Sequence, residues 1–325
     1  MKNKRGTNNK LKLHKQFFSN KWDKKWRRQN RIWKLFIAIY FIGLIISSDN
    51  ITAGYFLHTR LGIKNTCKKV YKIAIIDSAF DLSQLPSKNI VGQRNISNNS
   101  PIISKVPMFD YSGNIKLSNH GTDIIKLFIG EFGLLPNALI VPIQINDSQD
   151  LPAATQYAIS QGVDAISISL SFAPSFRAMP LVGRTALLEA AKHVPIVIAA
   201  GNDGQALEST AYGQSMLTLI NAAGGKIFLV AATKFSIFGL FGRFLDTKYE
   251  RLTNFTNFSQ ADNQYVISAP GENIKLGNIA QQTVHLNSLH GTSIAAPLAL
   301  IKAIYCVNNA PISQPITLIE ALASA

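Results

Sequence analysis

Four side chains of complementary chemistry occupy the ends of predicted strands or the starts of predicted helices, namely Asp77, His120, Asn202 and Ser293. A serine hydroxyl is a poor nucleophile at neutral pH and needs a base such as imidazole within hydrogen-bond reach. A carboxylate can orient that imidazole, and an amide can bind an oxyanion. Each residue alone also suits a helix cap, a helix start or a turn. The four together indicate covalent catalysis by a serine.

Ser293 lies in the stretch 290–297, whose sequence is HGTSIAAP. The small and helix-forming residues around it predict a turn that presents the serine at the start of a helix, where the helix dipole favours a developing negative charge. Gly291 allows a sharp turn, and Pro297 costs little hydrogen bonding near the start of a helix. An ordinary helix cap fits this stretch about equally well, so the rest of the chain must decide.

From residue 70 onward, continuous apolar runs alternate with segments of helical periodicity. Fully buried strands are predicted over 72–76, 138–145, 165–170, 195–200 and 227–232. Helices are predicted over 122–129, 153–161, 184–193 and 293–306. This alternation predicts a three-layer α/β/α fold with a mostly parallel central sheet. Active sites of such sheets gather beyond the carboxyl ends of the strands, which is where the four side chains fall.

At these residues the chain resembles the subtilisin-like serine proteases, or subtilases, over about residues 70–325. The stretch 291–297 (GTSIAAP) fits the serine signature of that family completely and is the most specific match. Residues 120–122 (HGT) resemble the histidine segment of the family, and residues 77–78 (DS) resemble its aspartate segment. Residues 199–202 (AAGN) resemble its oxyanion segment. Two further similar stretches are 163–171 (VDAISISLS) and 269–274 (APGENI). All of them occur in the order of the family.

The resemblance implies a role for each group. Ser293 would be the nucleophile, His120 the general base and acid, and Asp77 the carboxylate that orients the imidazole. The side-chain amide of Asn202 and the backbone N–H of Ser293 would bind the oxyanion. Five residues would bind substrate, three on one edge of the cleft and two on the opposite wall of its main pocket: Ser169, Leu170, Ser171, Ala200 and Gly201.

Four residues depart from the pattern of the family. Ala79 replaces a glycine after Asp-Ser, so this turn must avoid positive φ or tolerate strain. In the histidine helix, Asp123 and Lys126 replace a histidine and a glycine, and Lys126 must extend along the surface or loosen a helix contact. Ser171 replaces a glycine at the substrate-binding edge. These changes remove no catalytic group.

Other candidate groups are weaker. His285 and His290 are rival bases, but neither opens a helix with a Gly-Thr turn, and both suit partly exposed loop positions. No cluster has metal-ligand spacing, and no cofactor motif is present. Calcium often stabilises subtilases, yet no acidic cluster stands out, so we assign no metal and no cofactor. Cys67 and Cys306 are far apart in sequence; they could pair, or Cys306 could be a buried free thiol in its apolar helix.

The net charge of +15 is concentrated at the N-terminus. Residues 1–34 hold 13 of the 33 Lys and Arg residues with one acid, Asp23, whereas the remainder carries a charge of only +3. A uniformly basic, nucleic-acid-binding surface is therefore not supported, and we expect polypeptide substrates instead. Two alternatives remain: a membrane-anchored binding or scaffolding module on an inactive subtilase fold, and a serine-carboxyl peptidase with a glutamate base.

The apolar run that follows predicts membrane association. We expect a basic cytoplasmic tail over 1–34, a signal-anchor or signal-peptide segment over 35–48, a linker over 49–69 and a catalytic domain over 70–325. The 12 apolar residues 35–46 are short for a full span, which needs about 20. Because the basic segment directly precedes this run, we nevertheless expect a single-pass protein with its catalytic domain outside the cytoplasm. The alternatives are export after signal cleavage, and a peripheral or buried segment.

Overall fold

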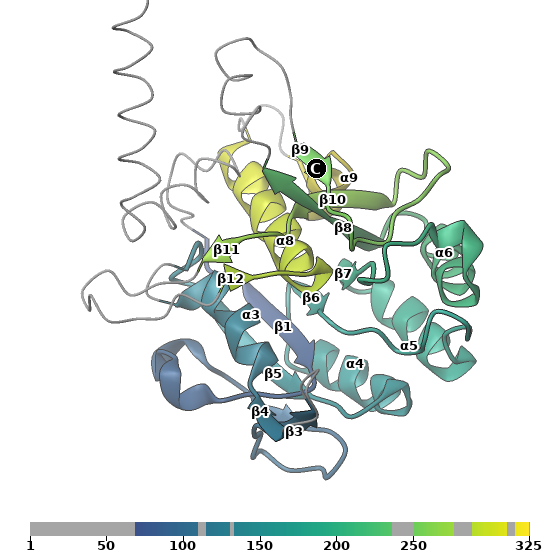
Figure 1. The fold of residues 1–325 in the computed structure, drawn as a ribbon. Helices are drawn as coiled ribbons and strands as arrows, with labels where there is room; N and C mark the ends of the chain where they lie inside the picture. Colours follow the sequence, from purple (N-terminus) through teal and green to yellow (C-terminus); the bar gives the residue numbers. More distant parts are fainter. Residues whose placement is uncertain are drawn as a thin grey trace, which may run out of the picture. The chain divides into compact units, whose positions relative to one another are not determined.

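A mostly parallel, eight-stranded sheet forms the centre of the described part of the chain (Figure 1). The computed structural model describes residues 69–109, 115–130, 133–235, 250–275, 288–310 and 316–324. The strand order is β10-β8-β7-β6-β1-β5-β2, and β9 pairs antiparallel with β8. The strands are β1 (Lys72–Asp77), β2 (Arg94–Asn95), β5 (Leu139–Gln144), β6 (Ala165–Ile168), β7 (Ile196–Ala199), β8 (Ile227–Phe235), β9 (Glu250–Leu252) and β10 (Val266–Pro270). All five predicted strands are confirmed, with their ends shifted by a few residues.

Helices cover both faces of this sheet. The alternation of side chains along β1 shows why: Ile73 and Ile75 belong to one buried cluster, and Ala74 and Ile76 belong to the other. The first cluster contains side chains of α3 (His120–Ile129), α8 (Thr292–Asn309) and α9 (Leu318–Ala323). The second contains side chains of α4 (Leu151–Ser160), α5 (Leu181–Ala191) and α6 (Ala211–Ala223). The predicted α/β/α layering is therefore confirmed.

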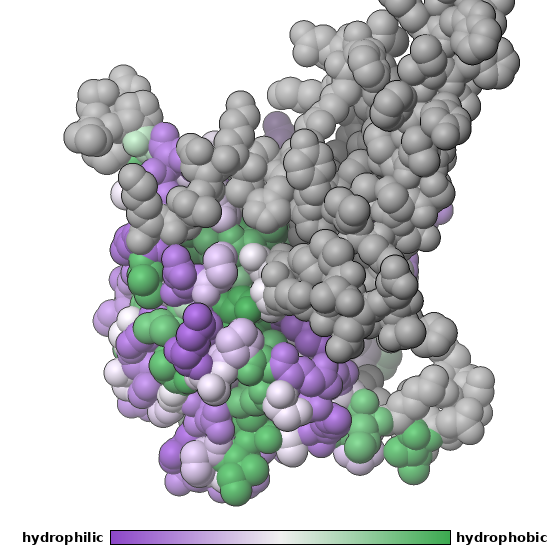
Figure 2. All heavy atoms as spheres, turned by 90° about the vertical axis from the view of Figure 1, so that its left-hand side faces the viewer, coloured by the Kyte–Doolittle hydropathy of each residue, from purple (hydrophilic) through white to green (hydrophobic). Residues whose placement is uncertain are grey.

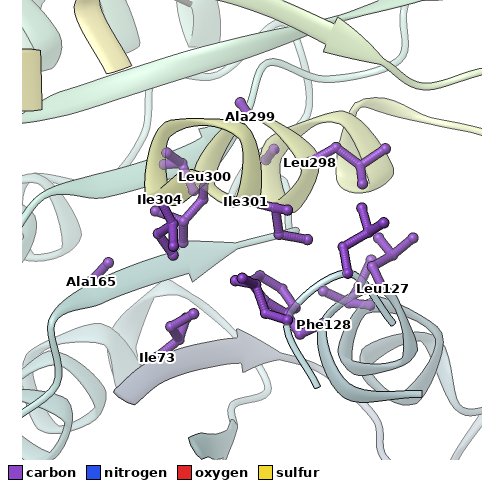
Figure 3. Close-up of a cluster of buried hydrophobic side chains, with 14 of the residues drawn as sticks. Ile73, Leu127, Phe128, Ala165, Leu298, Ala299, Leu300, Ile301 and Ile304 are labelled. Carbon is purple, nitrogen blue, oxygen red and sulfur yellow. The ribbon is translucent and has the colours of Figure 1, made fainter. Parts of the chain in front are cut away.

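Helix α8 is the most deeply buried element of the first layer. Its side chains Ile301 and Ile304 point toward the strands that carry Ile73 and Ala165, and Phe128 of α3 lies beside them (Figure 3). All five of these side chains are less than 2% exposed. Burial of this kind contributes roughly 1.5–3 kcal/mol for each large aliphatic or aromatic side chain. The helix that carries Ser293 is thus fixed along its length by the core.

Two small antiparallel pairs lie outside the main sheet. One is β3 (Val106–Phe109) with β4 (Ile115–Ser118), and the other is β11 (Ile274–Lys275) with β12 (Ser288–Leu289). The first pair exposes the apolar side chains of Ile115 and Leu117. Figure 2, which faces the left-hand side of Figure 1, shows apolar side chains interspersed with polar ones. Short 3-10 helices span Leu82–Gln84, Ser87–Asn89, Ser148–Asp150 and Leu207–Ser209.

The structure differs from the sequence predictions at Cys306 and in several elements, and part of the predictions falls outside the described residues. The Cys306 side chain is exposed rather than buried, because it points away from the face of α8 that packs on the sheet. Helices α6 and α9 and the strands β2, β9 and β10 of the main sheet were not predicted. The predicted tail, apolar segment and linker, together with Cys67, lie outside the described residues apart from the last residue of the linker. None of the helices in the described ranges is long and apolar enough to cross a membrane.

Candidate active site

Asp77 and His120 form a hydrogen-bonded pair. Asp77 is the last residue of β1 and is fully buried, and His120 is the first residue of α3. The His120 Nδ1 atom lies 2.9 Å from Asp77 Oδ2 and 3.0 Å from Asp77 Oδ1. The neighbouring Ser78 N–H also donates to Asp77 Oδ1, at 2.7 Å. An ionised carboxylate can only accept, so Nδ1 carries the proton and Nε2 is left as the basic nitrogen.

The electrostatic surroundings favour the protonated imidazole of His120. Its burial opposes the charged form, but the negative charge and hydrogen bond of Asp77 outweigh that penalty, and the charge of Asp123 adds to them. The pKa of His120 therefore lies above its ordinary value of 6.5. The side chain is still 35% exposed, so a ligand in solution can reach it. His120 can act as a general base in its neutral form.

Ser293 is the second residue of α8 and is 8% exposed. Backbone N–H groups in the first turn of a helix have no acceptor within it, so the Ser293 N–H is available to a ligand. Gly291 precedes the helix with φ 132°, a conformation that favours glycine. A Cβ atom at Gly291 would lie 3.0 Å from Ser293 Oγ and 3.3 Å from Asn202 Nδ2. The absence of a side chain there leaves room beside both groups.

Pro297 explains an additional contact of the serine. It lies inside α8, four residues after Ser293, and has no N–H to donate to the Ser293 carbonyl. The Ser169 hydroxyl donates to that carbonyl oxygen at 2.8 Å. Our expectation that Pro297 costs little hydrogen bonding is thus corrected, because one helix bond is absent. Ser169 supplies its replacement from beyond the end of β6.

Asn202 is oriented by Thr292. The Asn202 Oδ1 atom accepts from the Thr292 N–H at 2.8 Å and from the Thr292 hydroxyl at 3.1 Å. The same hydroxyl accepts from the Gly201 N–H at 3.1 Å. A backbone N–H can only donate, so the atom facing it must be the amide oxygen. The Asn202 NH2 group is consequently the part of the amide that remains for a ligand.

A cavity of about 420 Å³ brings these groups together. Its lining residues are Ser78, Ser118, His120, Ser169, Leu170, Ser171, Ala199, Gly201, Asn202, Thr292 and Ser293. Asp77 lies behind His120. Of the nine residues expected in the site, only Asp77 and Ala200 do not line this cavity, and Ala200 is buried in the second core cluster. Its neighbour Ala199 forms part of the wall instead.

The departures from the family pattern are accommodated locally. Among the described residues, the non-glycine positions with positive φ are Asn99 and Asn273, so Ala79 avoids that conformation. Lys126 extends along the surface, where its ammonium group lies 2.8 Å from Gln84 Oε1 and 3.4 Å from Asp123 Oδ1. The two unusual residues of α3 thus form a pair with each other.

Ser171 is held at the edge of the cavity. Its side chain hydrogen-bonds with the hydroxyl of Tyr212, which also accepts from the Phe172 N–H at 3.4 Å. Burial raises the pKa of Tyr212 to about 12, so this phenol is neutral at physiological pH. The extra hydroxyl of Ser171, at a position where the family has glycine, is therefore tied to α6.

The other candidate groups remain apart from this arrangement. His290 is exposed, and its Nδ1 atom accepts from the Asn273 N–H at 3.4 Å. His285 lies outside the described residues. Within the described ranges, no group of three or more His, Cys, Asp or Glu side chains could hold a metal ion.

Sequence reasoning assigned no role to several supporting residues. Thr292 and Ser78 are adjacent to predicted residues, so inspecting the neighbours of each motif would have found them. Gln144 pairs in register with Asp77, is 2% exposed, and donates to the Ser78 carbonyl at 2.9 Å. A buried polar residue at the end of an apolar strand was the available signal. Ser118 ends β4, and nothing in its sequence context indicated a place in the cavity.

Comparisons with known proteins agree with this architecture. Residues 68–321 match the model of the subtilase family. No curated protein matches the chain. Among solved structures, it is similar to the A-subunit of the AB5 toxin from E. coli, with a TM-score of 0.56, 19% identity and coverage of 83% of this chain and 88% of that one.

Two peptide-processing enzymes are also similar in fold. A lanthipeptide protease aligns with a TM-score of 0.53 and 18% identity, over 84% of this chain and 86% of that one. The prenylagaramide maturation protease PagA aligns with a TM-score of 0.50 and 19% identity, over 79% and 81%. At these identities the likeness concerns the fold. The family model, in contrast, covers most of the sequence, and the chain therefore belongs to the subtilase family of serine proteases.

Proposed function

We propose that this chain is an active serine endopeptidase. Asp77, His120 and Ser293 are its catalytic triad, and Asn202 donates to the oxyanion. The observation that carries the proposal is the pairing of His120 Nδ1 with a fully buried carboxylate in a cavity that also contains Ser293 and an oriented amide. A chain that had lost activity would have no need to retain this combination.

The proposed reaction begins with attack of the Ser293 hydroxyl on the carbonyl carbon of the scissile peptide bond. His120 Nε2 accepts the hydroxyl proton and then donates it to the leaving amine. The Ser293 N–H and the Asn202 amide bind the negative charge on the carbonyl oxygen in the tetrahedral intermediate. A water molecule then hydrolyses the acyl-enzyme by the same steps. Asp77 stabilises the imidazolium throughout without taking its proton.

The cavity walls support a preference for apolar side chains before the cleaved bond. The lining residues carry hydroxyl, amide and small apolar groups, and His120 is the only one that can be charged. We propose that main-chain pairing along 169–171 binds extended peptides and that the pocket takes medium apolar side chains such as Leu or Met. Ser171, held by Tyr212, narrows the edge and disfavours bulky aromatic side chains.

A peptide-library digest of wild type and Ser171→Gly tests this specificity. We expect cleavage after medium apolar residues in wild type and a gain in cleavage after aromatic residues in the variant. A dominant preference for Arg or Lys, or no gain for aromatics, would contradict the proposal.

Hydrolysis of a fluorescently quenched protein substrate tests the function itself. The full chain should release internal peptides, whereas Ser293→Ala with the same circular dichroism spectrum should release none. Trimming from the chain ends alone would favour an exopeptidase. Equal activity of both proteins would rule out Ser293 as the nucleophile.

We also propose that the N-terminal segment anchors the chain in a membrane with the catalytic domain outside the cytoplasm. The support is the charge of +12 on residues 1–34, directly before the apolar run 35–46. Protease added outside intact cells should then digest the catalytic domain and spare the basic tail. Recovery of a soluble exported domain that lacks the tail would instead support signal cleavage.

A further inference from the structure

The loop 200–205, which carries Asn202, has no helix or strand of its own. A second segment, 253–258, lies against it and is joined to it by backbone hydrogen bonds. The Asn257 N–H donates to the Gly201 carbonyl at 2.9 Å, and the Gly204 N–H donates to the Phe255 carbonyl at 2.7 Å. These bonds fix the two segments side by side but leave the groups nearest Asn202 to be held by side chains.

The Asn257 side chain supplies those contacts. It is 3% exposed, and both ends of its amide are used. Its NH2 group donates to the Ala200 carbonyl and to Asp203 Oδ2, each at 3.1 Å. Its oxygen accepts from the N–H groups of Asp203 and Gln205, each also at 3.1 Å. One buried side chain therefore contacts the loop on both sides of Asn202.

The conformation of Gly201 is matched to this side chain. Gly201 has φ 104°, and a Cβ atom built on it would collide with the Asn257 amide nitrogen. The loop thus leaves the space next to Asn202 for the amide of Asn257. Thr292 holds the tip of the Asn202 side chain, whereas Asn257 holds the backbone from which that side chain projects.

We propose that Asn257 is a positioning residue for the oxyanion-binding amide of Asn202. The inference rests on the proposed function, since it needs Asn202 to stabilise the transition state. Asn257 touches no reacting atom. Its effect is to keep the Asn202 amide within hydrogen-bond distance of the developing oxyanion, where small displacements reduce the rate strongly.

Asn89 provides a matched control. It is also a buried asparagine, 4% exposed, and its amide donates to the carbonyls of Pro136 and Ala138 at 3.0 and 2.8 Å. It holds a loop that does not line the cavity. Asn257→Ser and Asn89→Ser both remove a buried amide, which makes four hydrogen bonds at Asn257 and two at Asn89, and only the first should act on catalysis.

The experiment is a double-mutant cycle on the full chain. Wild type, Asn257→Ser, Asn202→Ala and the double variant are compared by kcat, by KM and by the rate of labelling with a fluorophosphonate, at a temperature where all are folded. We expect Asn257→Ser to lower kcat and the labelling rate about 10- to 100-fold with little change in KM. In the Asn202→Ala background it should change either rate less than about twofold, because the group it positions is absent. Asn89→Ser should lower only the melting temperature.

The possible outcomes distinguish the positioning role of Asn257 from the proposed function. Equal losses from Asn257→Ser in both backgrounds, or a loss of thermal stability alone, would overturn the positioning role while leaving the proposed function intact. A wild-type rate for Asn202→Ala would overturn the oxyanion assignment and the inference together. If Asn257→Ser does not fold, Asp203→Ala replaces it, since it removes one contact of Asn257 from an exposed position. The same double-mutant cycle is then run with Asp203→Ala, for which we expect a smaller loss of kcat and of the labelling rate.

Discussion

The triad and the oxyanion loop are held in different ways. Asp77, His120 and Ser293 stand at the last residue of β1, the first of α3 and the second of α8, so regular backbone hydrogen bonds fix their positions. Asn202 lies in a loop without regular structure: the Thr292 N–H and hydroxyl hold its side chain, and the Asn257 side chain holds its loop. The residues proposed to perform the covalent steps are thus placed by the fold, whereas the residue proposed to stabilise charge is placed by individual polar contacts.

This difference predicts which substitutions should change stability, activity or both. A residue that supports an element end should change stability and activity together, because the element is part of the core. A residue that supports the loop can change activity with little loss of stability. The following variants test that division.

The largest effect is expected at the triad. Asp77→Asn keeps the shape of the side chain but removes the carboxylate that accepts from His120 Nδ1, so the imidazole adopts the wrong tautomer. We expect kcat to fall about 10⁴-fold. Steady-state hydrolysis of a peptide substrate measures it. A loss below tenfold would show that the buried pair does not orient the base.

A smaller effect is expected in the oxyanion loop. Asn202→Ala should lower kcat about 10²- to 10³-fold, as removal of this amide does in a relative of the family, with KM nearly unchanged. Thr292→Val removes the hydroxyl that orients the amide and should lower kcat by less; because it also leaves the buried Gly201 N–H without that acceptor, we expect a loss of about 1–3 kcal/mol in the free energy of unfolding.

Thr155→Val is the control for Thr292→Val, since the Thr155 hydroxyl is buried and donates to the Leu151 carbonyl within α4, away from the cavity. It should leave kcat unchanged. If Thr155→Val lowers kcat as much as Thr292→Val does, the loss is a general effect of removing a buried hydroxyl, and the comparison between elements and loop fails.

Ser167 and Ser169 are neighbouring buried serines, but within the described residues only Ser169 makes a hydrogen bond to α8. Ser169→Ala leaves the Ser293 carbonyl without a donor, which should cost about 1–3 kcal/mol in the free energy of unfolding and also reduce activity. The Ser167 hydroxyl is buried and has no hydrogen-bond partner in the described structure, so Ser167→Ala should be neutral or stabilising. Urea denaturation of both variants measures this. Equal effects would contradict the role of Ser169 at α8.

The smallest effect concerns the pH dependence of the base. Activity requires neutral His120, so kcat/KM falls as pH decreases through its pKa, which lies above the ordinary 6.5. Asp123 contributes to that raised pKa, so Asp123→Asn should move the acidic limb of the profile to lower pH. Glu189→Gln is the control, because Glu189 of α5 forms an i,i+3 pair with Lys192, which directly follows that helix. A shift to higher pH, or the same shift in both variants, would contradict the assignment.

The division between elements and loop also explains what the sequence could predict. Continuous apolar runs revealed five of the eight strands of the main sheet, and parallel topology placed their carboxyl ends together, so the proposed catalytic residues could be found at element boundaries. The GTSIAAP stretch was specific enough to single out Ser293 as the candidate nucleophile. All of these signals are local, or follow from a simple topological rule.

The supporting residues could not be found in this way. Ser169 meets the Ser293 carbonyl across 124 positions of sequence, and Asn257 meets Asp203 across 54. No periodicity links such pairs. Helix α6 was missed although the Thr210 side chain caps it, so a local signal was available there. Tertiary contacts decide only the long-range pairs.

Mapping the adduct of a fluorophosphonate probe by mass spectrometry tests the central claim most directly. The account predicts a single adduct on Ser293 in the wild-type chain, none in Ser293→Ala, and labelling slowed by orders of magnitude in folded His120→Ala. An adduct on another serine, or undiminished labelling of Ser293 without His120, would contradict a triad built on Asp77, His120 and Ser293.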